Sequence, residues 1–385
     1  MKKLAIIGAE TMACNYAINA REMGVETYCF AYEKGAIAKD IVDNFYPISI
    51  FETDQIIAKC REVGVNGVVA TTELTVHVAA YVARQLGLNG IDPTVASRLT
   101  DKYFNREAAK EVVGLNQPGY CVIRSREEAG RINLKFPIIL KPIAEGGKRG
   151  ITVVYSIDEL SAAIEYAASE SKRGYEIIVE EFLPEGIECS VETLSYHNKH
   201  MVIQVTEKIS SGPPHCVELG HIQPARISDE MRRKVEEVIP GMLTALGYDN
   251  GPSHTEIKIV GDRIYLIECN TRPGGDFITY PLVNLSTGYY HLKGAIQIAL
   301  DEFAFPNRAS FEKSCAGVCF VTDQTRFLAS VFAVCQEYPW CYRKHEVGPI
   351  EVMNHNNCDG TNYFIWHDKI GMPQMVGTLL NGGKL

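Results

Sequence analysis

The chain has 385 residues, of which 46% are hydrophobic and 22% charged, so it is long enough for two or three globular domains. Its 38 basic and 47 acidic residues give a formal net charge of −9, which argues against a general nucleic-acid or membrane-surface binder. We expect no signal peptide and no membrane span, because no apolar run is long enough. The twelve cysteines lack metal-type spacing, so we expect reduced thiols and a cytoplasmic location.

Residues 1–95 alternate predicted strands and helices. Apolar runs over 4–8, 27–30 and 67–70 predict buried strands, with one helix ending near residue 23 and another over 73–86. This alternation is typical of the parallel, Rossmann-like α/β class. The glycine fingerprint of dinucleotide binding is missing after Gly8, so we expect a scaffold or substrate-side domain.

From residue 96 the pattern changes to α+β. Helix starts are predicted near residues 100–102, 125–128, 156–159 and 228, and the second and third of these are capping boxes. Strands are predicted over residues 138–141, 151–154, 176–179, 188–193 and 201–205. The last stretch, 301–385, has short β-like runs without a recognisable motif.

Residues 253–270 form the most informative segment. Two β-branched runs flank a Gly-Asp-Arg turn, which predicts a β-hairpin. If the turn is centred on Asp262, Glu256 and Glu268 face each other about 5 Å apart, and His254 faces Asn270. Two such carboxylates repel unless a hard cation lies between them, and Mg²⁺ that carries nucleotide phosphates is the usual case. A solvated hairpin with uncoupled acids, or a register shifted by one residue, remains open.

A second segment, residues 136–154, predicts phosphate binding. It reads as a strand, a turn with Gly146, Gly147, Lys148 and Arg149, and a second strand. Glycines let backbone N–H groups approach phosphate oxygens, and the cations add charge, as does Lys141 at the end of the first strand. The spacing is not that of a P-loop, and a plain turn with solvated basic residues is the alternative.

Three further segments carry polar groups whose roles the residues alone leave open. The strand break at 184–186 could present backbone groups to a nucleotide base, or be an ordinary hairpin. Arg272 suits a phosphate or carboxylate, but equally a structural salt bridge. Residues 216–226 contain an acid, a histidine and an arginine that could grip a zwitterionic substrate, or form a polar loop.

In order and spacing these segments resemble the ATP-grasp superfamily. Its metal-binding Glu…Glu-x-Asn-x-Arg signature is similar to Glu256, Glu268, Asn270 and Arg272. The resemblance implies an ATP-grasp fold, in which two α+β subdomains grip ATP, preceded by a Rossmann-like pre-ATP-grasp domain. It also implies three regions: a first domain over 1–95, the ATP-grasp domain over 96–300 with a mobile lid over about 118–185, and a C-terminal region over 301–385 that completes the core or the substrate pocket.

The resemblance implies a role for each matching residue. Mg²⁺, or Mn²⁺ as a substitute, would be held by Glu256, Glu268 and Asn270, and Arg272 and Lys141 would be catalytic. ATP would be bound by Lys102, Lys141, Glu145, Gly146, Gly147, Lys148, Gly150, Glu180, Glu181, Leu183 and Glu188. The amino-acid substrate would contact Glu218, His221, His254, Arg272 and Gly275.

Within the superfamily, the strings 253–258 and 217–225 look most like the dipeptide-forming L-amino-acid ligases. The resemblance thus implies an ADP-forming carboxylate–amine ligase that works through an acyl phosphate, with a small-molecule carboxylate and amine as substrates. It also allows a homodimer. One alternative is an ATP-grasp enzyme of nucleotide metabolism or carboxylation, with formate or bicarbonate as the activated acid. Another is a non-catalytic ATP-binding regulator.

Overall fold

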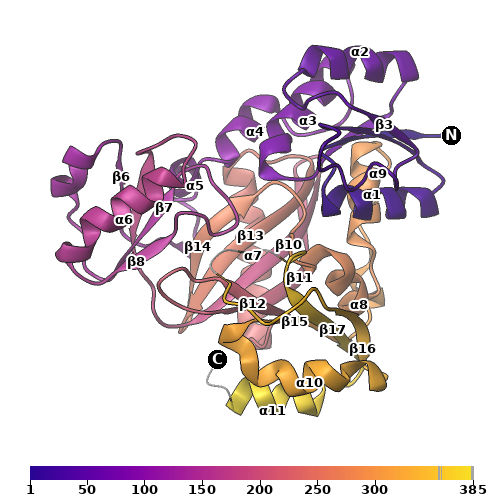
Figure 1. The fold of residues 1–385 in the computed structure, drawn as a ribbon. Coiled ribbons are helices and arrows are strands. Elements are labelled where there is room, and N and C mark those ends of the chain that lie inside the picture. The colour runs from indigo at the N-terminus through magenta and orange to yellow at the C-terminus, as the bar shows by residue number, and fades with distance from the viewer. Residues whose placement is uncertain (354–355, 357, 383–385) are drawn as a thin grey trace.

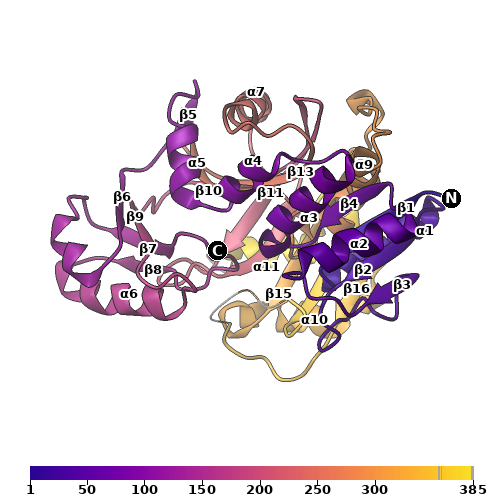
Figure 2. The same cartoon turned by 90° about the horizontal axis from the view of Figure 1, so that it is seen from above.

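The computed structural model describes residues 1–353, 356 and 358–382, which form three β-sheets with helices packed around them (Figure 1). Two four-stranded sheets lie in separate lobes, on either side of a nine-stranded central sheet (Figures 1 and 2). Within the described residues, every helix is too short or too polar to span a bilayer. All twelve cysteines are free thiols, as expected.

The first sheet is parallel throughout. Its strands in spatial order are β3 (Asn44–Tyr46), β2 (Glu26–Phe30), β1 (Lys3–Ile7) and β4 (Gly67–Ala70). The helices of this lobe are α1 (Thr11–Glu22), α2 (Thr53–Val63), α3 (Glu73–Leu86) and α4 (Pro93–Leu99). The strands and helices predicted for this segment are confirmed, and β3, α2 and α4 are additional.

Helices cover both faces of this sheet because its central strand is almost wholly apolar. Leu4 and Ile6 of β1 pack into one core with α1, whereas Ala5 and Ile7 pack into another with α2 and α3. Burial on both faces is typical of a parallel strand. The first core also contains α9 (His291–Ala299), so a helix from much later in the chain holds this lobe against the rest of the molecule.

The central sheet is antiparallel except for its last pair. Its strands in spatial order are β16 (Cys341–His345), β17 (Asn362–Asp368), β15 (Cys315–Val321), β12 (Glu218–Gln223), β11 (Lys199–Ser210), β10 (Ile187–Tyr196), β13 (Gly251–Val260), β14 (Arg263–Asn270) and β5 (Leu115–Asn116). The helices beside it are α5 (Lys102–Ala108), α7 (Asp229–Ala245), η2 (Ile278–Leu282), α8 (Val283–Thr287), η3 (Arg308–Ser310), η4 (Asp323–Leu328), α10 (Ala329–Val334), η5 (Cys335–Glu337) and α11 (Gln374–Gly382). The C-terminal strands therefore extend this sheet beyond β12.

The third sheet is antiparallel and has its own core. Its strands in spatial order are β6 (Tyr120–Ile123), β9 (Ile177–Glu181), β7 (Ile138–Pro142) and β8 (Thr152–Val154), with η1 (Arg126–Arg131) and α6 (Ile157–Ser169) packed on them. The two predicted capping boxes of this lobe are only half right. Helices do follow Ser125 and Ser156, the first as a short 3-10 helix, but neither serine side chain caps its helix.

In the hairpin of β13 and β14, Glu256 pairs with Glu268 as predicted, but the turn and the strand register differ from the prediction. The turn contains only Gly261 and Asp262, since Val260 pairs with Arg263. A regular ladder from that turn would place Glu256 opposite Ile267. Instead the register shifts at a β-bulge, and Glu256 pairs with Glu268.

The bulge decides which side chains reach the cavity face of the sheet. Before it, Ile264 and Leu266 point into the core, and after it Cys269 does. Successive residues of a regular strand alternate between the two faces of the sheet. Core residues therefore change from even to odd positions only because the bulge inserts one extra residue. Ile267 and Glu268 therefore both line the cavity.

A buried arginine joins the bulged strand to the third sheet. Arg106 of α5 donates through Nε to Glu180 Oε1 of β9 at 2.7 Å, and through Nη2 to the carbonyl of Ile267 at 2.9 Å. Both side chains of the ion pair are 1% exposed. Lys141 of β7 donates to the other Glu180 oxygen at 2.6 Å. These cations outweigh the effect of burial and hold the pKa of Glu180 at about 2.

Replacing Arg106 with methionine is expected to lower the free energy of unfolding in urea by about 3 kcal/mol, because the Glu180 carboxylate stays buried with only Lys141 as partner. The control is Arg326→Met, which breaks an exposed ion pair with Asp323. That variant should change stability by less than about 0.5 kcal/mol. Similar losses in both variants would contradict the structural role of Arg106.

Candidate active site

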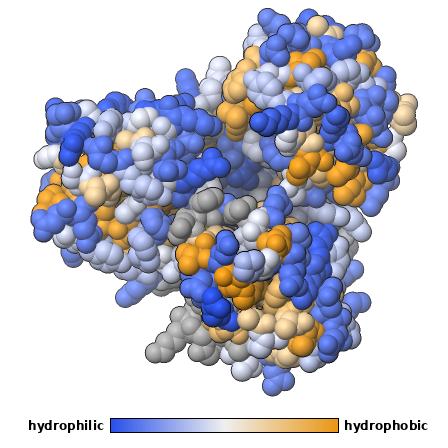
Figure 3. Space-filling view, in the orientation of Figure 1, coloured by the Kyte–Doolittle hydropathy of each residue, from blue (hydrophilic) through white to orange (hydrophobic). Residues whose placement is uncertain are grey.

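A cavity of about 410 Å³ is lined by residues of the central and third sheets and by loop and helix residues of the N-terminal lobe. In the space-filling view it opens as a hollow with largely hydrophilic walls where the lobes meet (Figure 3). Seventeen of the residues predicted for the site line it: Lys102, Lys141, Glu145, Gly146, Gly147, Lys148, Glu180, Glu181, Leu183, Glu188, Glu218, His254, Glu256, Glu268, Asn270, Arg272 and Gly275.

Two predicted site residues do not line the cavity. Gly150 has a φ of +67°, and a Cβ built on it would lie 2.7 Å from Pro142. We predicted that Gly150 contacts ATP. In the structure it instead allows a tight turn after β7 that a residue with a side chain would obstruct. His221 is fully buried on β12 beneath the cavity wall.

The centre of the cavity holds acids bridged by lysines. Lys208 of β11 donates to Glu256 Oε1 and contacts Glu218 Oε1, each at 2.6 Å, and its side chain is only 2% exposed. Lys148, from the turn between β7 and β8, lies 3.3 to 3.7 Å from Glu188, Glu218 and Glu256. Burial disfavours every one of these charges, so they persist only as a mutually paired set.

This pairing is visible in the protonation of the groups. Burial opposes the charged forms, but Lys208 and Lys148 hold the pKa of Glu218 at about 2 and that of Glu256 well below its usual range. The same acids raise the pKa of Lys208 above its usual value. Lys208, Glu218 and Glu256 are therefore ionised in the neutral range.

The predicted metal ligands are brought together. Glu256 and Glu268 are cross-strand partners, and Asn270 lies two residues further along β14. Lys102 of α5 contacts Glu268 Oε1 at 3.4 Å and donates to the Glu145 carbonyl at 2.7 Å. Two carboxylates and an amide make an all-oxygen donor set, which fits a hard cation such as Mg²⁺. Other acids lie close to this donor set. One carboxylate oxygen each of Glu188, Glu218 and Glu256 lies within 4.8 Å of the other two.

His254 belongs to a second buried pair. Its Nδ1 lies 2.7 Å from Glu192 Oε1, and its Nε2 lies 3.5 Å from Glu256 Oε1. Burial opposes protonation of the ring, but the two carboxylates outweigh it and raise the pKa of His254 to about 9. A Cβ on Gly274 would lie 2.7 Å from His254 Nδ1, so only glycine allows this packing. His254 is thus fixed as a cation on the cavity face of β13.

Arg272 links the central sheet to the N-terminal lobe. Its guanidinium donates to the carbonyl of Pro273 and forms an ion pair with Glu73, in the first turn of α3. Glu10, which follows β1, and Thr71 and Thr72, which follow β4, line the cavity beside it. Ligand sites at the carboxyl ends of parallel strands are a general property of such sheets, so this position was a signal that sequence reasoning could have used.

Sequence reasoning missed four functional candidates: Lys208, Glu73, Glu192 and Asp276. Asp276 follows the Arg-Pro-Gly-Gly stretch, and burial and then the charge of Glu218 raise its pKa to about 6. A charged residue near the end of β11 was the available signal for Lys208. Its partners lie on other strands, so the sequence alone did not reveal its place in the centre of the site.

The chain matches known proteins through one domain and through its whole fold. Residues 134–280 match the family model described as the ATP-grasp domain. The formate-dependent phosphoribosylglycinamide formyltransferase of Bacillus subtilis is 22% identical, over 78% of this chain and 79% of that protein. The C-terminal section of the carbamoyl phosphate synthase large chain of Aquifex aeolicus is 29% identical over 52% of this chain, and the match spans only 37% of that protein.

Two crystal structures illustrate the likeness of the fold. L-amino acid ligase from Bacillus licheniformis superposes with a TM-score of 0.79 at 21% identity, covering 100% of this chain and 97% of that one. The biotin carboxylase domain of Hydrogenobacter thermophilus 2-oxoglutarate carboxylase, a dimer in complex with MgADP, ADP and bicarbonate, gives 0.74 at 19% identity, covering 96% and 86%. The chain therefore contains an ATP-grasp domain, and its fold is that of the ATP-grasp ligases.

Proposed function

We propose that this protein is an ATP-dependent, ADP-forming ligase that joins the carboxylate of an amino acid to an amine. The observation that carries the proposal is the order of groups along one cavity. Lysines that suit phosphates lie at the end formed by the third sheet, paired acids lie in the centre, and Arg272 lies beside them toward the N-terminal lobe. The likeness in fold to L-amino acid ligase over the whole chain supports an amino-acid substrate.

ATP is proposed to lie between the third sheet and the central sheet. Lys102, Lys141 and Lys148 would contact its phosphates, with backbone N–H groups of the Gly146–Gly147 turn. Glu180, Glu181 and Leu183 line the cavity where β9 ends, at the proposed adenine position, and Glu188 would accept hydrogen bonds from the ribose. The sheet over about 118–185 would serve as a lid that keeps water from the transferring phosphoryl group.

The donor set of Glu256, Glu268 and Asn270 is proposed to hold Mg²⁺, because all its donors are oxygens and its two carboxylates face each other. Bound there, Mg²⁺ would neutralise phosphate charge. The chain's own contribution is to fix those oxygens. The bulge at Ile267 turns Glu268 toward Glu256, and His254, which Glu192 holds, lies 3.5 Å from Glu256 Oε1.

The reaction then follows from positioning. The substrate carboxylate attacks the γ-phosphorus of ATP, forming an acyl phosphate and ADP, and an amine attacks its carbonyl and releases phosphate. Arg272 is proposed to exchange Glu73 for the transferring phosphoryl group, whose negative charge its planar fork suits. Glu218, His254 and Gly275 line the cavity where the amino acid would lie. A homodimer, which the resemblance allows, stays a prediction.

A second candidate is a ribonucleotide-modifying enzyme, which the similarity to the formate-dependent formyltransferase favours. Such a substrate carries its own phosphate, which needs cations outside the ATP site. The residues that the N-terminal lobe contributes to the described cavity wall are Glu10, Thr11, Met12, Asn15, Thr71, Thr72 and Glu73. These residues are acidic or uncharged, and none of them is basic. They could not neutralise a substrate phosphate, so this part of the wall favours a zwitterionic or cationic substrate.

The direct test is ADP release from MgATP in the presence of pools of amino acids. We expect at least one pool to raise ADP formation above the rate without amino acid, and dipeptides to appear in the product. Formate or bicarbonate with ribonucleotides should give no increase. If ATP binds and no amino-acid pool stimulates ADP release, the ligase proposal is wrong. That result would instead support a non-catalytic ATP-binding regulator.

Replacing Glu268 with glutamine is expected to reduce that ADP formation at least about 100-fold, because one of the two facing carboxylates is lost. Glu268 is partly exposed to the cavity, so the thermal unfolding temperature should change little. The control is Glu237→Gln, an exposed acid on α7, which should keep full activity. Near-normal turnover of the Glu268 variant would remove the metal assignment.

A further inference from the structure

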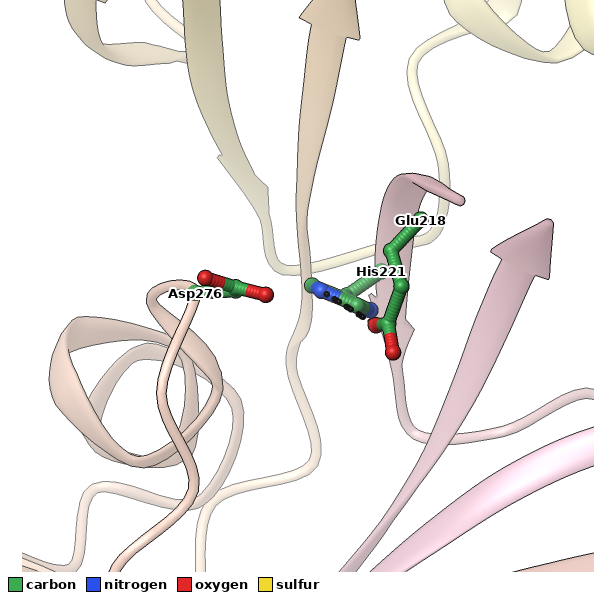
Figure 4. Close-up of side chains that lie close together, drawn as sticks. All are labelled: Glu218, His221 and Asp276. Carbon is green, nitrogen blue, oxygen red and sulfur yellow. Dashed lines mark ion pairs between the residues drawn. The ribbon is translucent and has the colours of Figure 1, made fainter. Parts of the chain in front are cut away.

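Three side chains outside the proposed Mg²⁺ ligand set converge at the substrate end of the cavity. Glu218 and His221 lie on β12, and Asp276 lies in the loop after β14 (Figure 4). One ligand atom of each lies within 4.8 Å of the others, and His221 Nε2 is 3.3 Å from Glu218 Oε2. Three donors at this spacing have the dimensions of a metal-binding group.

His221 is the observation that makes this cluster more than a pair of acids. The ring is fully buried and its nitrogens form no hydrogen bond among the described residues; Nε2 has only the 3.3 Å contact with Glu218, and Nδ1 has no hydrogen-bond partner. A buried polar group without a partner costs free energy, so its presence calls for an explanation. Burial also favours the neutral imidazole, whose lone pair is free to bind a metal ion.

The acids of the cluster lack sufficient cationic partners. Lys208 contacts Oε1 of Glu218, which leaves Oε2 on the side of His221. Asp276 adds a second carboxylate, and among the described residues it forms no ion pair with a lysine or arginine. A bound divalent cation would supply the positive charge that this pair of acids lacks.

The surroundings hold Asp276 in place for such a role. Asn356 donates through Nδ2 to Asp276 Oδ2 at 3.2 Å, and its own Oδ1 accepts from the backbone N–H of Glu218 at 3.1 Å. One amide therefore joins the Asp276 carboxylate to the backbone of Glu218. Ordered partners of this kind fix the orientation of metal-binding carboxylates.

We propose that Glu218, His221 and Asp276 bind a borderline divalent metal ion such as Zn²⁺ or Co²⁺, at a site separate from Glu256, Glu268 and Asn270. The imidazole nitrogen selects such ions over Mg²⁺ and Ca²⁺, which prefer oxygen alone. Three protein ligands leave coordination positions open toward the cavity, because Glu218 and Asp276 both line it. The site is therefore placed to meet a substrate.

The test is titration of the chelator-treated, full-length protein with Zn²⁺ by calorimetry and with Co²⁺ by visible absorption, in excess Mg²⁺ and without ATP. We expect one ion per chain, and binding at least about 100-fold weaker in both Asp276→Asn and His221→Gln. Because Asp276 lies in a loop, its variant tests the site even if the His221 variant fails to fold.

Two controls separate this site from others. Glu268→Gln and Asp359→Asn, the latter an exposed acid at the same cavity, should bind the ion as the unaltered protein does. If the Asp276 variant also binds it normally, or if the cobalt spectrum shows thiolate coordination by cysteines, the proposal is wrong. The measurement needs no turnover, so failure of the ligase assay with intact Zn²⁺ binding would overturn the proposed function and leave this site standing.

Discussion

The structure depends on one irregularity, the β-bulge at Ile267. Without it, Glu268 would share a face with Thr255 and point toward the core, and the two acids of the hairpin would not meet. A bulge leaves a backbone group outside the ladder, and here Arg106 binds the Ile267 carbonyl while it also binds Glu180. The same arginine therefore secures the bulge and joins the third sheet to the central sheet, so the geometry of the candidate site and the fold depend on the same buried cation.

The pairing of Glu256 with Glu268 followed from the sequence, but the reason given for it was incomplete. A turn centred on Asp262 gave the right partners near the site, whereas the real turn is one residue shorter and the bulge restores the register. Nothing in the apolar pattern of β14 marks the bulge except the change of phase between Leu266 and Cys269. Local patterns predicted most strands and helices because the alternation of apolar residues shows which face of an element is buried. The same alternation does not show which residue of the partner strand lies opposite, so it could not reveal the bulge.

Long-range partners explain the remaining misses. Lys208 and Glu73 are unremarkable in their own segments and matter because of Glu256 and Arg272, which are distant in the chain. The converse error is His221, whose polar neighbours suggested a cavity position although β12 turns it inward. Residues 301–385 gave no motif because β15 and β17 bury both faces, one against α10 and α11 and the other beside η2 and α8, so their apolar runs look like any core.

The charge pairs of the cavity constrain how a ligand enters it. Each lysine proposed for phosphate binding already has a carboxylate partner: Lys102 has Glu268, Lys141 has Glu180, and Lys148 has Glu188 and Glu256. Phosphates alone would draw Lys102 from Glu268 and Lys148 from Glu188 and Glu256, so that Lys208 would be the only lysine left in contact with Glu188 and Glu256 among the described residues. A metal ion alone would displace the lysines without giving them new partners. Only a metal–nucleotide complex supplies both an anion for the lysines and a cation for Glu256 and Glu268. The buried network thus favours binding of the two as one unit.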